Sequence, residues 1–290
     1  MINSPTALRF FIAALCVCAV AHAQDRKKNP TSKFYVADTQ GDAQVDTGKE
    51  IDDLVKRGVF SAEGAILETK ANSNASVVFS NGTGVFLDVS TRIDIRKFLQ
   101  EAFKPSKGDI DDEPSISTTH VYIEQGVIGV STSNHAAGSS MEYDTALAQT
   151  SIHGRQAVIA AGDNVTVISM VQGEATLRAG PLGSSYVIKN GEQAIVKPGP
   201  TGEANSVYIH GIPDGNDEEA SVWLQERVLT ADNARKMVYF DVQGKKADGS
   251  ISFFDGASGD GETSAIVPVP VVPANPPVQP TVSAANLSGH

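Results

Sequence analysis

Short apolar runs separated by turn residues limit the fold of this chain more than any other feature. From Phe34 to about Lys197, runs rich in Val, Ile and Phe alternate at close intervals with Gly, Asn and Asp. This pattern is typical of an all-β domain, because strands are short and these small polar residues favour turns. We therefore predict a mainly β domain over residues 34–210.

Two Asn-Gly pairs mark predicted hairpins. Asn81-Gly82 and Asn190-Gly191 each stand between two apolar runs. Asn-Gly in that position is the strongest short-range hairpin signal, because both residues tolerate a positive φ. We expect each pair to join two neighbouring antiparallel strands.

The remaining β runs suggest repetition. Residues 164–171 are apolar on both alternations, which predicts a strand covered on both faces, and Gly173 is expected to turn the chain into the next strand. An acidic connection from Glu101 to Thr119 divides the domain into two halves with the same rhythm of strand, turn and strand. This repetition favours a β-solenoid-like or stacked antiparallel-sheet architecture.

The period changes after the β domain. Residues 216–240 predict an amphipathic helix packed on the β domain, with Asn216 as its N-cap. Trp223 is expected to anchor this helix, and a contact with a partner protein is the alternative. The apolar positions at helical spacing are Ala220, Leu224, Val228 and Ala231. The polar positions on the rest of the helix are Glu226, Arg227, Asp232 and Arg235.

The last segment lacks any periodicity. Residues 245–290 are rich first in Gly and Asp and then in Pro and Val. Such composition predicts an extended, disordered tail.

The first residues read as a secretory leader. Residues 1–23 contain an apolar run, Phe10–Val20, followed by an Ala-x-Ala pattern that places cleavage between Ala23 and Gln24. Residues 24–33 form a polar linker. The two cysteines of the chain lie in the leader, so the exported chain is expected to carry neither a disulfide nor a lipid anchor. We expect a periplasmic or secreted protein.

The charge balance disfavours two classes of partner. The chain has 34 Asp and Glu against 23 Lys and Arg, and removal of Arg9 with the leader gives a net charge of −12 (22 minus 34). A nucleic-acid partner would require a basic stripe, which the sequence does not show. No later apolar stretch is long enough for a membrane span, so we do not expect an integral membrane protein.

A set of segments over residues 58–197 resembles the FecR domain, the periplasmic signalling domain of bacterial iron-uptake regulators. The similar segments are Gly64–Thr69, Ala75–Thr83, Val89–Ile95, Ala148–Ile159, Val165–Leu177 and Lys189–Gln193. Their motif and turn residues are Gly64, Thr69, Asn81, Gly82, Thr83, Gly154, Gly173, Asn190 and Gly191. The resemblance implies a β fold and a non-catalytic role that depends on a protein partner.

The chain departs from that family in two ways. Gly154-Arg155 stands where the family usually has Gly-Thr. The family's anti-sigma regulators also carry a cytoplasmic helical segment and a transmembrane helix, which this sequence lacks. The chain therefore looks like an exported, free-standing variant that needs an envelope protein to pass on a signal.

Catalytic patterns are missing from the sequence. Apart from His22 in the leader, the histidines stand singly, without metal-ligand spacing, and no nucleophile elbow or phosphate-binding loop appears. His153 beside Gly154 is expected to be structural. The acidic groups near residues 109–113 and 214–219 are expected to be solvated loops, with Ca²⁺ binding as the alternative. We predict no enzyme activity, cofactor or metal.

Three functions remain open on the sequence. The first is a non-catalytic envelope module that binds a protein partner in signalling. The second is a structural or adhesive surface protein on the same scaffold, and the third is a hydrolase whose carboxylates meet only in three dimensions. Exposed strand edges would favour the first of these. The sequence leaves the oligomeric state and the identity of the partner open.

Overall fold

A computed structural model describes residues 32–103, 111–179, 184–200, 203–212, 218–245 and 251–254. The predicted leader, the Ala23–Gln24 junction and residues 24–31 of the linker lie outside the described residues. The same holds for Asn216 and for residues 255–290 of the predicted tail.

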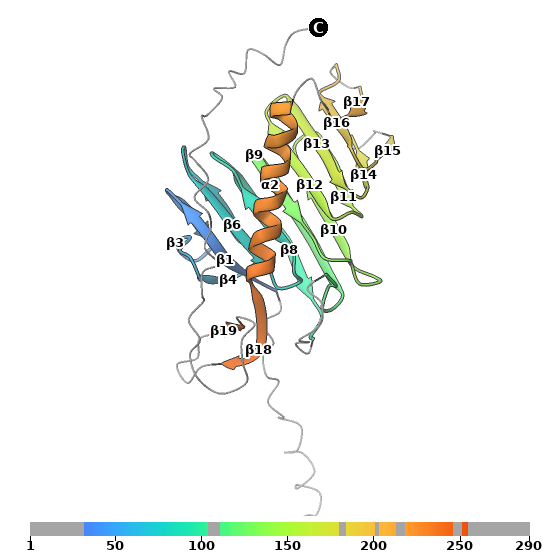
Figure 1. The fold of residues 1–290 in the computed structure, drawn as a ribbon. Coiled ribbons are helices and arrows are strands. Elements are labelled where there is room, and N and C mark those ends of the chain that lie inside the picture. Colours follow the sequence, from blue (N-terminus) through green and yellow to red (C-terminus); the bar gives the residue numbers. More distant parts are fainter. Residues whose placement is uncertain are drawn as a thin grey trace, which may run out of the picture. The chain divides into compact units, whose positions relative to one another are not determined.

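Seventeen strands joined by hydrogen bonds build two stacked layers, which confirms the mainly β prediction in its stacked-sheet form (Figure 1). All pairings are antiparallel except the parallel pair of β9 with β10. The helix-side layer contains, in spatial order, β4 (Val59–Ser61), β1 (Lys33–Gln40), β6 (Asn74–Phe79), β7 (Gly84–Leu87), the C-terminal part of β9 (Ser117–Ser131), β12 (Gln156–Gly162), β13 (Val165–Gln172), β16 (Glu192–Lys197) and β17 (Ser206–Gly211). The second layer contains β3 (Ile51–Asp53), β2 (Ala43–Asp46), β5 (Ile66–Thr69), β8 (Arg92–Gln100), the N-terminal part of β9, β10 (Ser140–Asp144), β11 (Gln149–Ile152), β14 (Ala175–Arg178) and β15 (Ser185–Ile188).

Strand β9 belongs to both layers because it changes layer at Gly126. This glycine has a φ of +95°, and a Cβ there would lie 2.4 Å from the Thr91 hydroxyl oxygen. The same hydroxyl accepts the Val127 N–H at 3.0 Å. A residue with a side chain would be strained by the backbone and would also collide with Thr91, so glycine is required at this corner.

The two halves of the domain repeat one unit, as the sequence rhythm predicted. In the first half, β5 pairs with β8 in the second layer while the enclosed β6 and β7 pair in the helix-side layer. In the second half, β11 and β14 form the outer pair and β12 and β13 the inner pair. Each unit is therefore a nested hairpin whose first and fourth strands lie in the second layer and whose second and third strands lie in the helix-side layer.

The two Asn-Gly pairs have different roles. Asn81-Gly82 closes the β6–β7 hairpin as predicted, although only Gly82 takes a positive φ, of +87°. The hairpin prediction at Asn190-Gly191 is wrong. Among the described strands, β15 pairs with β14, whereas β16 pairs with β13 and β17, so this turn carries the chain from one layer to the other. Gly191 supplies the positive φ, of +76°, that such a turn needs.

The core lies between the two layers. The Phe34, Phe79 and Phe98 rings are fully buried there, and the Phe79 and Phe98 ring centroids are 4.9 Å apart. The opposite face of the second layer is charged, with Arg92 bound to Glu68 and Glu124 across neighbouring strands. The described residues therefore form one main core, and the outer face of the second layer is solvated.

A single long helix among the described residues, α2 (Glu218–Met237), covers the outer face of the helix-side layer (Figure 1). It packs on β1, β6, β7, β9, β12 and β13. Two glycines allow this close approach of the helix. A Cβ at Gly84 would lie 2.2 Å from the Ala231 carbonyl oxygen, and a Cβ at Gly129 would lie 2.6 Å from the Arg227 carbonyl oxygen. The helix backbone thus rests directly on the strands. No helix in the described part of the chain is long and apolar enough to span a membrane.

The helix prediction is confirmed in kind and corrected in length. The predicted range of 216–240 is too long, because α2 ends at Met237 and Tyr239 begins β18 (Tyr239–Lys245). β18 pairs with β19 (Ile251–Phe254). Within residues 246–290, β19 is the part that the structure describes.

Candidate interaction surface

Most motif residues identified in the sequence hold corners of the fold. Thr69 lies at the corner between β5 and β6 and is buried. Its N–H donates to the Thr91 carbonyl at 2.9 Å, and its hydroxyl accepts the Thr91 N–H at 3.0 Å and donates to the Asp88 carbonyl at 2.5 Å. Thr69 therefore joins the two corners of the first nested hairpin. Gly64, with a φ of +78°, turns the chain into β5 and donates its N–H to the Ile95 carbonyl.

Gly154 and Gly173 form the equivalent corners of the second unit. A Cβ at Gly173 would lie 2.2 Å from the Cα of Gly154, so the two corners touch backbone to backbone. Next to them, Arg155 donates to Asp111 at 2.8 Å. His153 lies on this corner, and its ring meets the Thr176 hydroxyl at 3.4 Å. The contacts among these residues hold the corners between β11 and β12 and between β13 and β14 together.

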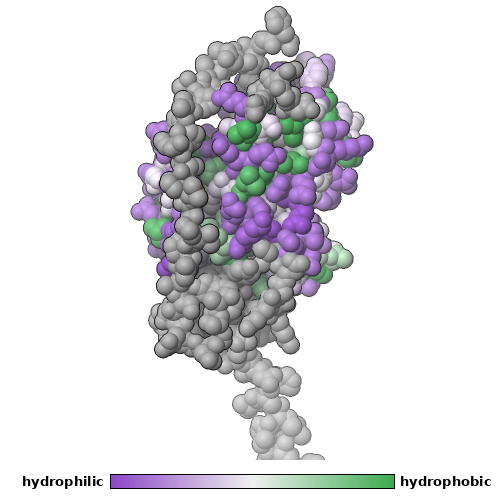
Figure 2. Space-filling model, viewed as in Figure 1, coloured by the Kyte–Doolittle hydropathy of each residue, from purple (hydrophilic) through white to green (hydrophobic). Residues whose placement is uncertain are grey.

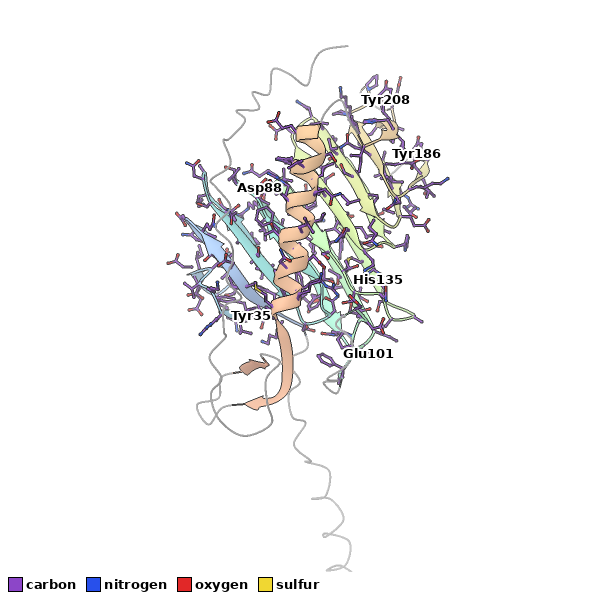
Figure 3. All side chains as sticks on the ribbon, in the orientation of Figure 1. Tyr35, Asp88, Glu101, His135, Tyr186 and Tyr208 are labelled. Carbon is purple, nitrogen blue, oxygen red and sulfur yellow. The ribbon has the colours of Figure 1, made fainter. Side chains whose placement is uncertain are left out.

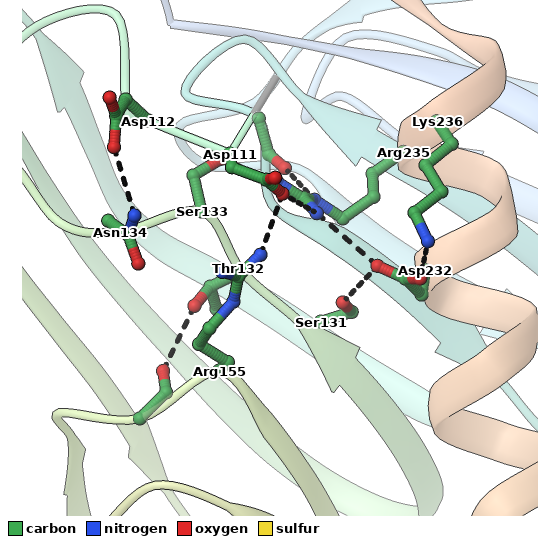
Figure 4. A network of polar contacts seen from close by, with 12 residues as sticks. Asp111, Asp112, Ser131, Thr132, Ser133, Asn134, Arg155, Asp232, Arg235 and Lys236 are labelled. Carbon is green, nitrogen blue, oxygen red and sulfur yellow. Dashed lines mark hydrogen bonds and ion pairs between the residues drawn. The ribbon is translucent and has the colours of Figure 1, made fainter. Parts of the chain in front are cut away.

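A buried polar network fixes the C-terminal half of α2 (Figure 4). Arg235 donates to the Gly82 carbonyl at 3.0 Å and to the Ser133 hydroxyl at 2.8 Å, and it pairs with Asp232 at 3.3 Å. Asp232 also accepts from Ser131 at 3.0 Å. The sequence placed Asp232 and Arg235 on the polar side of the helix, and this is wrong because both are buried against a polar corner of the sheet.

The electrostatics of Asp232 follow from this network. Burial raises the pKa of Asp232, but hydrogen bonds from Lys236, Ser131 and Arg235 outweigh burial and leave the pKa below its ordinary value. The carboxylate is therefore charged at neutral pH and holds the end of α2 against the sheet.

The N-terminal half of α2 is fixed by a second arginine. Arg227 pairs with Asp88 through two nitrogens, one of them at 2.8 Å, and its guanidinium lies 3.6 Å from the centre of the Trp223 ring. Trp223 is half-buried against a small cluster that contains Leu224 and Val158. The structure thus places Trp223 as an anchor of α2, the first of the two roles considered from the sequence.

The acidic connection before β9 is tied to the protein. Glu113 is buried, accepting from the Ser117 hydroxyl at 2.5 Å and from the Ala136 N–H at 2.8 Å, so the expectation of a solvated loop is wrong for this residue. Burial lowers the pKa of the neighbouring His135, and the charge of Glu113 opposes that shift. In the described ranges, no three His, Cys, Asp or Glu side chains come close enough to hold a metal ion. Asp109, Asp214 and Asp217 lie outside those ranges.

The two layers end together at an edge that we call the open end, made of β15 and β17. Within the described residues β15 pairs with β14 alone and β17 with β16 alone, so each strand has a free side. Neither strand contains a charged residue. Tyr186 and Tyr208 lie toward this end of the molecule (Figure 3). Charged residues commonly protect edge strands from pairing, and the open end lacks them.

The pairing of β17 shows which backbone groups face outward. Ile212 donates its N–H to the Gly191 carbonyl at 2.7 Å, and antiparallel ladders alternate from there. Ser206, Tyr208 and His210 therefore bond to β16. The N–H and C=O groups of Val207, Ile209 and Gly211 face the free side, where the Gly211 carbonyl also accepts a hydrogen bond from the His210 ring at 2.7 Å.

An apolar row leads from α2 to this edge. Val167, Ile195 and Tyr208 are directly opposite one another on β13, β16 and β17, and the first two are half-buried while Tyr208 is 63% exposed. Figure 2 shows this face, where green side chains gather in the upper part among purple ones. The sequence prediction that residues 164–171 are covered on both faces is correct toward the core and partial toward α2, because Val165, Val167 and Val171 stay half-buried.

Comparisons with known proteins give a likeness of fold. No family model and no curated protein sequence matches the chain. Two crystal structures, each of a candidate anti-sigma factor from Parabacteroides distasonis, are similar to it. One has 17% sequence identity and a TM-score of 0.40 over 55% of this chain and 64% of that chain, so this chain spans less than two thirds of that protein. The other has 16% identity and a TM-score of 0.40 over 67% of this chain and 85% of that chain.

Proposed function

We propose that this chain is a non-catalytic interaction module of the cell envelope that acts through a protein partner and binds it along β17. The observation that carries the proposal is the uncharged open edge of β17. The envelope location rests on the leader-like first 23 residues, and a role in signalling rests on the FecR-like segments of the sequence.

An edge of this kind binds by strand addition. An extended segment of a partner would pair with the outward groups of Val207, Ile209 and Gly211, and these main-chain hydrogen bonds would supply affinity. Its side chains would alternate between the two faces of the sheet. On the outer face they would meet Tyr208 and continue the apolar row, which favours an uncharged segment with branched or aromatic residues.

The strands at the opposite ends of the two layers, β3 and β4, are poorer binding sites. β3 and β4 have three residues each, and β3 contains Asp52 and Asp53. Short strands and charges are the usual protection of an edge. The open end therefore differs from the opposite end of the same layers.

Site-specific photo-crosslinking tests this proposal. A photoreactive phenylalanine analogue replaces Tyr208 in the exported chain, and captured proteins are identified by mass spectrometry. The matched control carries the analogue at Ile51, which is 66% exposed on β3 against 63% for Tyr208. We expect capture of a defined protein from position 208 and none from position 51.

A second variant separates binding through the backbone from simple contact. Ile209→Pro removes one outward N–H, and because this N–H does not bond to β16, the β16–β17 pairing keeps its hydrogen bonds. This variant should lose the crosslink from position 208. Equal capture from positions 208 and 51, or capture that persists in the proline variant, would contradict strand addition at β17.

A further inference from the structure

We propose that the segment paired with β17 is β17 of a second copy, so that two chains form a two-fold dimer at the open end. This inference rests on the proposed function, since it names the strand that the edge takes up.

The sequence of β17 complements itself in the antiparallel direction. With Ile209 on the two-fold axis, Ile209 faces Ile209 of the second copy, and Val207 faces Gly211 of that copy. All these residues direct their N–H and C=O groups to the free side, so donors and acceptors match. The Gly211 carbonyl, which already accepts from the His210 ring at 2.7 Å, would accept from the second copy with its other lone pair. Tyr208 then lies opposite His210 of the second copy, on the same face of the joined sheet.

Charge favours the meeting of two open ends over other contacts. The chain has 34 acidic and 23 basic residues, so two copies repel one another at most surfaces. β15 and β17 contain no charged residue, and both are at this end. A head-to-tail contact would instead place the open end against Asp52 and Asp53 of β3. The two-fold arrangement avoids this contact and closes at two copies.

The size of the contact predicts a weak dimer. The ten residues of β15 and β17 in each copy are fewer than the roughly 20–30 residues a side of a standard stable interface. The side chains that the contact would cover are partly exposed, with Ile209 at 37% and Val187 at 52%. We expect a dissociation constant of roughly micromolar or weaker, and therefore dissociation on dilution.

Sedimentation velocity on the purified exported chain tests the inference over about a hundred-fold concentration range. Wild-type protein should pass from monomer to dimer in that range. Ile209→Glu and Ile209→Lys should each weaken association at least about tenfold, because like charges would face one another across the axis. An equimolar mixture of the two variants should restore the dimer. The same substitutions at Ile51, on the opposite end, should leave association unchanged.

A cysteine variant tests the same pairing through a disulfide, and it keeps the inference testable if the charged Ile209 variants unfold. The expected exported chain has no cysteine, so Ile209→Cys introduces a single thiol. Facing residues of a hydrogen-bonded antiparallel pair have Cα atoms about 5.5 Å apart, within the range that a disulfide bridges. Mild oxidation should give a disulfide-linked dimer, whereas Ile51→Cys should not.

The outcomes distinguish the two proposals. A wild-type chain that stays monomeric throughout, a dimer insensitive to the Ile209 variants, or a mixture that does not re-associate would overturn the two-fold β17 pairing. If position 208 then still captures a different envelope protein, the proposed interaction function remains. If position 208 captures nothing, both proposals fail.

Discussion

The close contact of the α2 backbone with Gly84 and Gly129 predicts how substitutions at these glycines change the stability of the protein. A Cβ at Gly84 would lie 2.2 Å from the Ala231 carbonyl oxygen, while ordinary contacts begin near 3.4 Å. The helix would have to rise by about 1 Å, since the obstructing atom is backbone, and such overpacking costs about 1–3 kcal/mol. Gly84→Ala should therefore lower the free energy of unfolding by that amount. Gly129→Ala should act similarly, because its Cβ would lie 2.6 Å from the Arg227 carbonyl oxygen.

Urea denaturation followed by the fluorescence of Trp223, the single tryptophan, measures the effect at the helix itself. The matched control is Gly162→Ala, whose Cβ would make an ordinary 3.6 Å contact with the Val165 carbonyl oxygen. The double variant should cost less than the sum of the single ones, because one displacement of α2 relieves both collisions. If Gly84→Ala and Gly162→Ala agree within about 0.5 kcal/mol, the close approach of α2 to the sheet is refuted.

Three further changes test the contacts that hold the fold. Arg235→Met should destabilise the protein by about 1–3 kcal/mol in chemical denaturation, because the Gly82 carbonyl and the Ser133 hydroxyl lose their buried donor, while Asp232 keeps its ion pair with Lys236. The pKa of Asp232 is lower in the folded than in the unfolded protein. The ionised carboxylate therefore stabilises the fold at pH values above its unfolded pKa of about 3.9. This stabilisation disappears as the pH falls through the folded pKa. The stability difference between wild type and Asp232→Asn should therefore shrink between about pH 5 and pH 2 in urea titrations, and a constant difference would contradict the assignment. Thr69→Val should cost about 1–3 kcal/mol, because the buried Thr91 N–H loses its acceptor, whereas Thr69→Ser should retain most of the stability in thermal denaturation.

Local patterns in the sequence predicted the elements better than their pairing. The apolar runs and turn glycines gave the β class, and the spacing of Leu224 and Val228 gave the helix. The Asn190-Gly191 turn was misread because a hairpin and a passage between layers use the same residue types. The difference lies in which distant strand each neighbour pairs with, and a short window of sequence does not contain that information.

The contacts under α2 were missed for a related reason. Gly84 and Gly129 read as ordinary strand or turn glycines, and nothing near them in the sequence indicates that the helix beginning at Glu218 rests on them. Arg235 reads as a solvated helix residue, yet its side chain is 1% exposed because the polar corner around Ser133 lies beneath it. The open end was also hidden, since an edge strand differs from a central strand only in its neighbours.

The passage of β9 through both layers has a consequence for how the protein unfolds. Stacked repeat units commonly lose structure one after another, because each contacts only its neighbours. Here the first unit pairs with β9 through β7 and β8, and the second half pairs with the same strand through β10 and β12. Neither half can detach without stripping hydrogen bonds from that one segment. The slowest backbone amides in hydrogen exchange should therefore cluster in Ser117–Ser131, and the two halves should melt in a single cooperative transition.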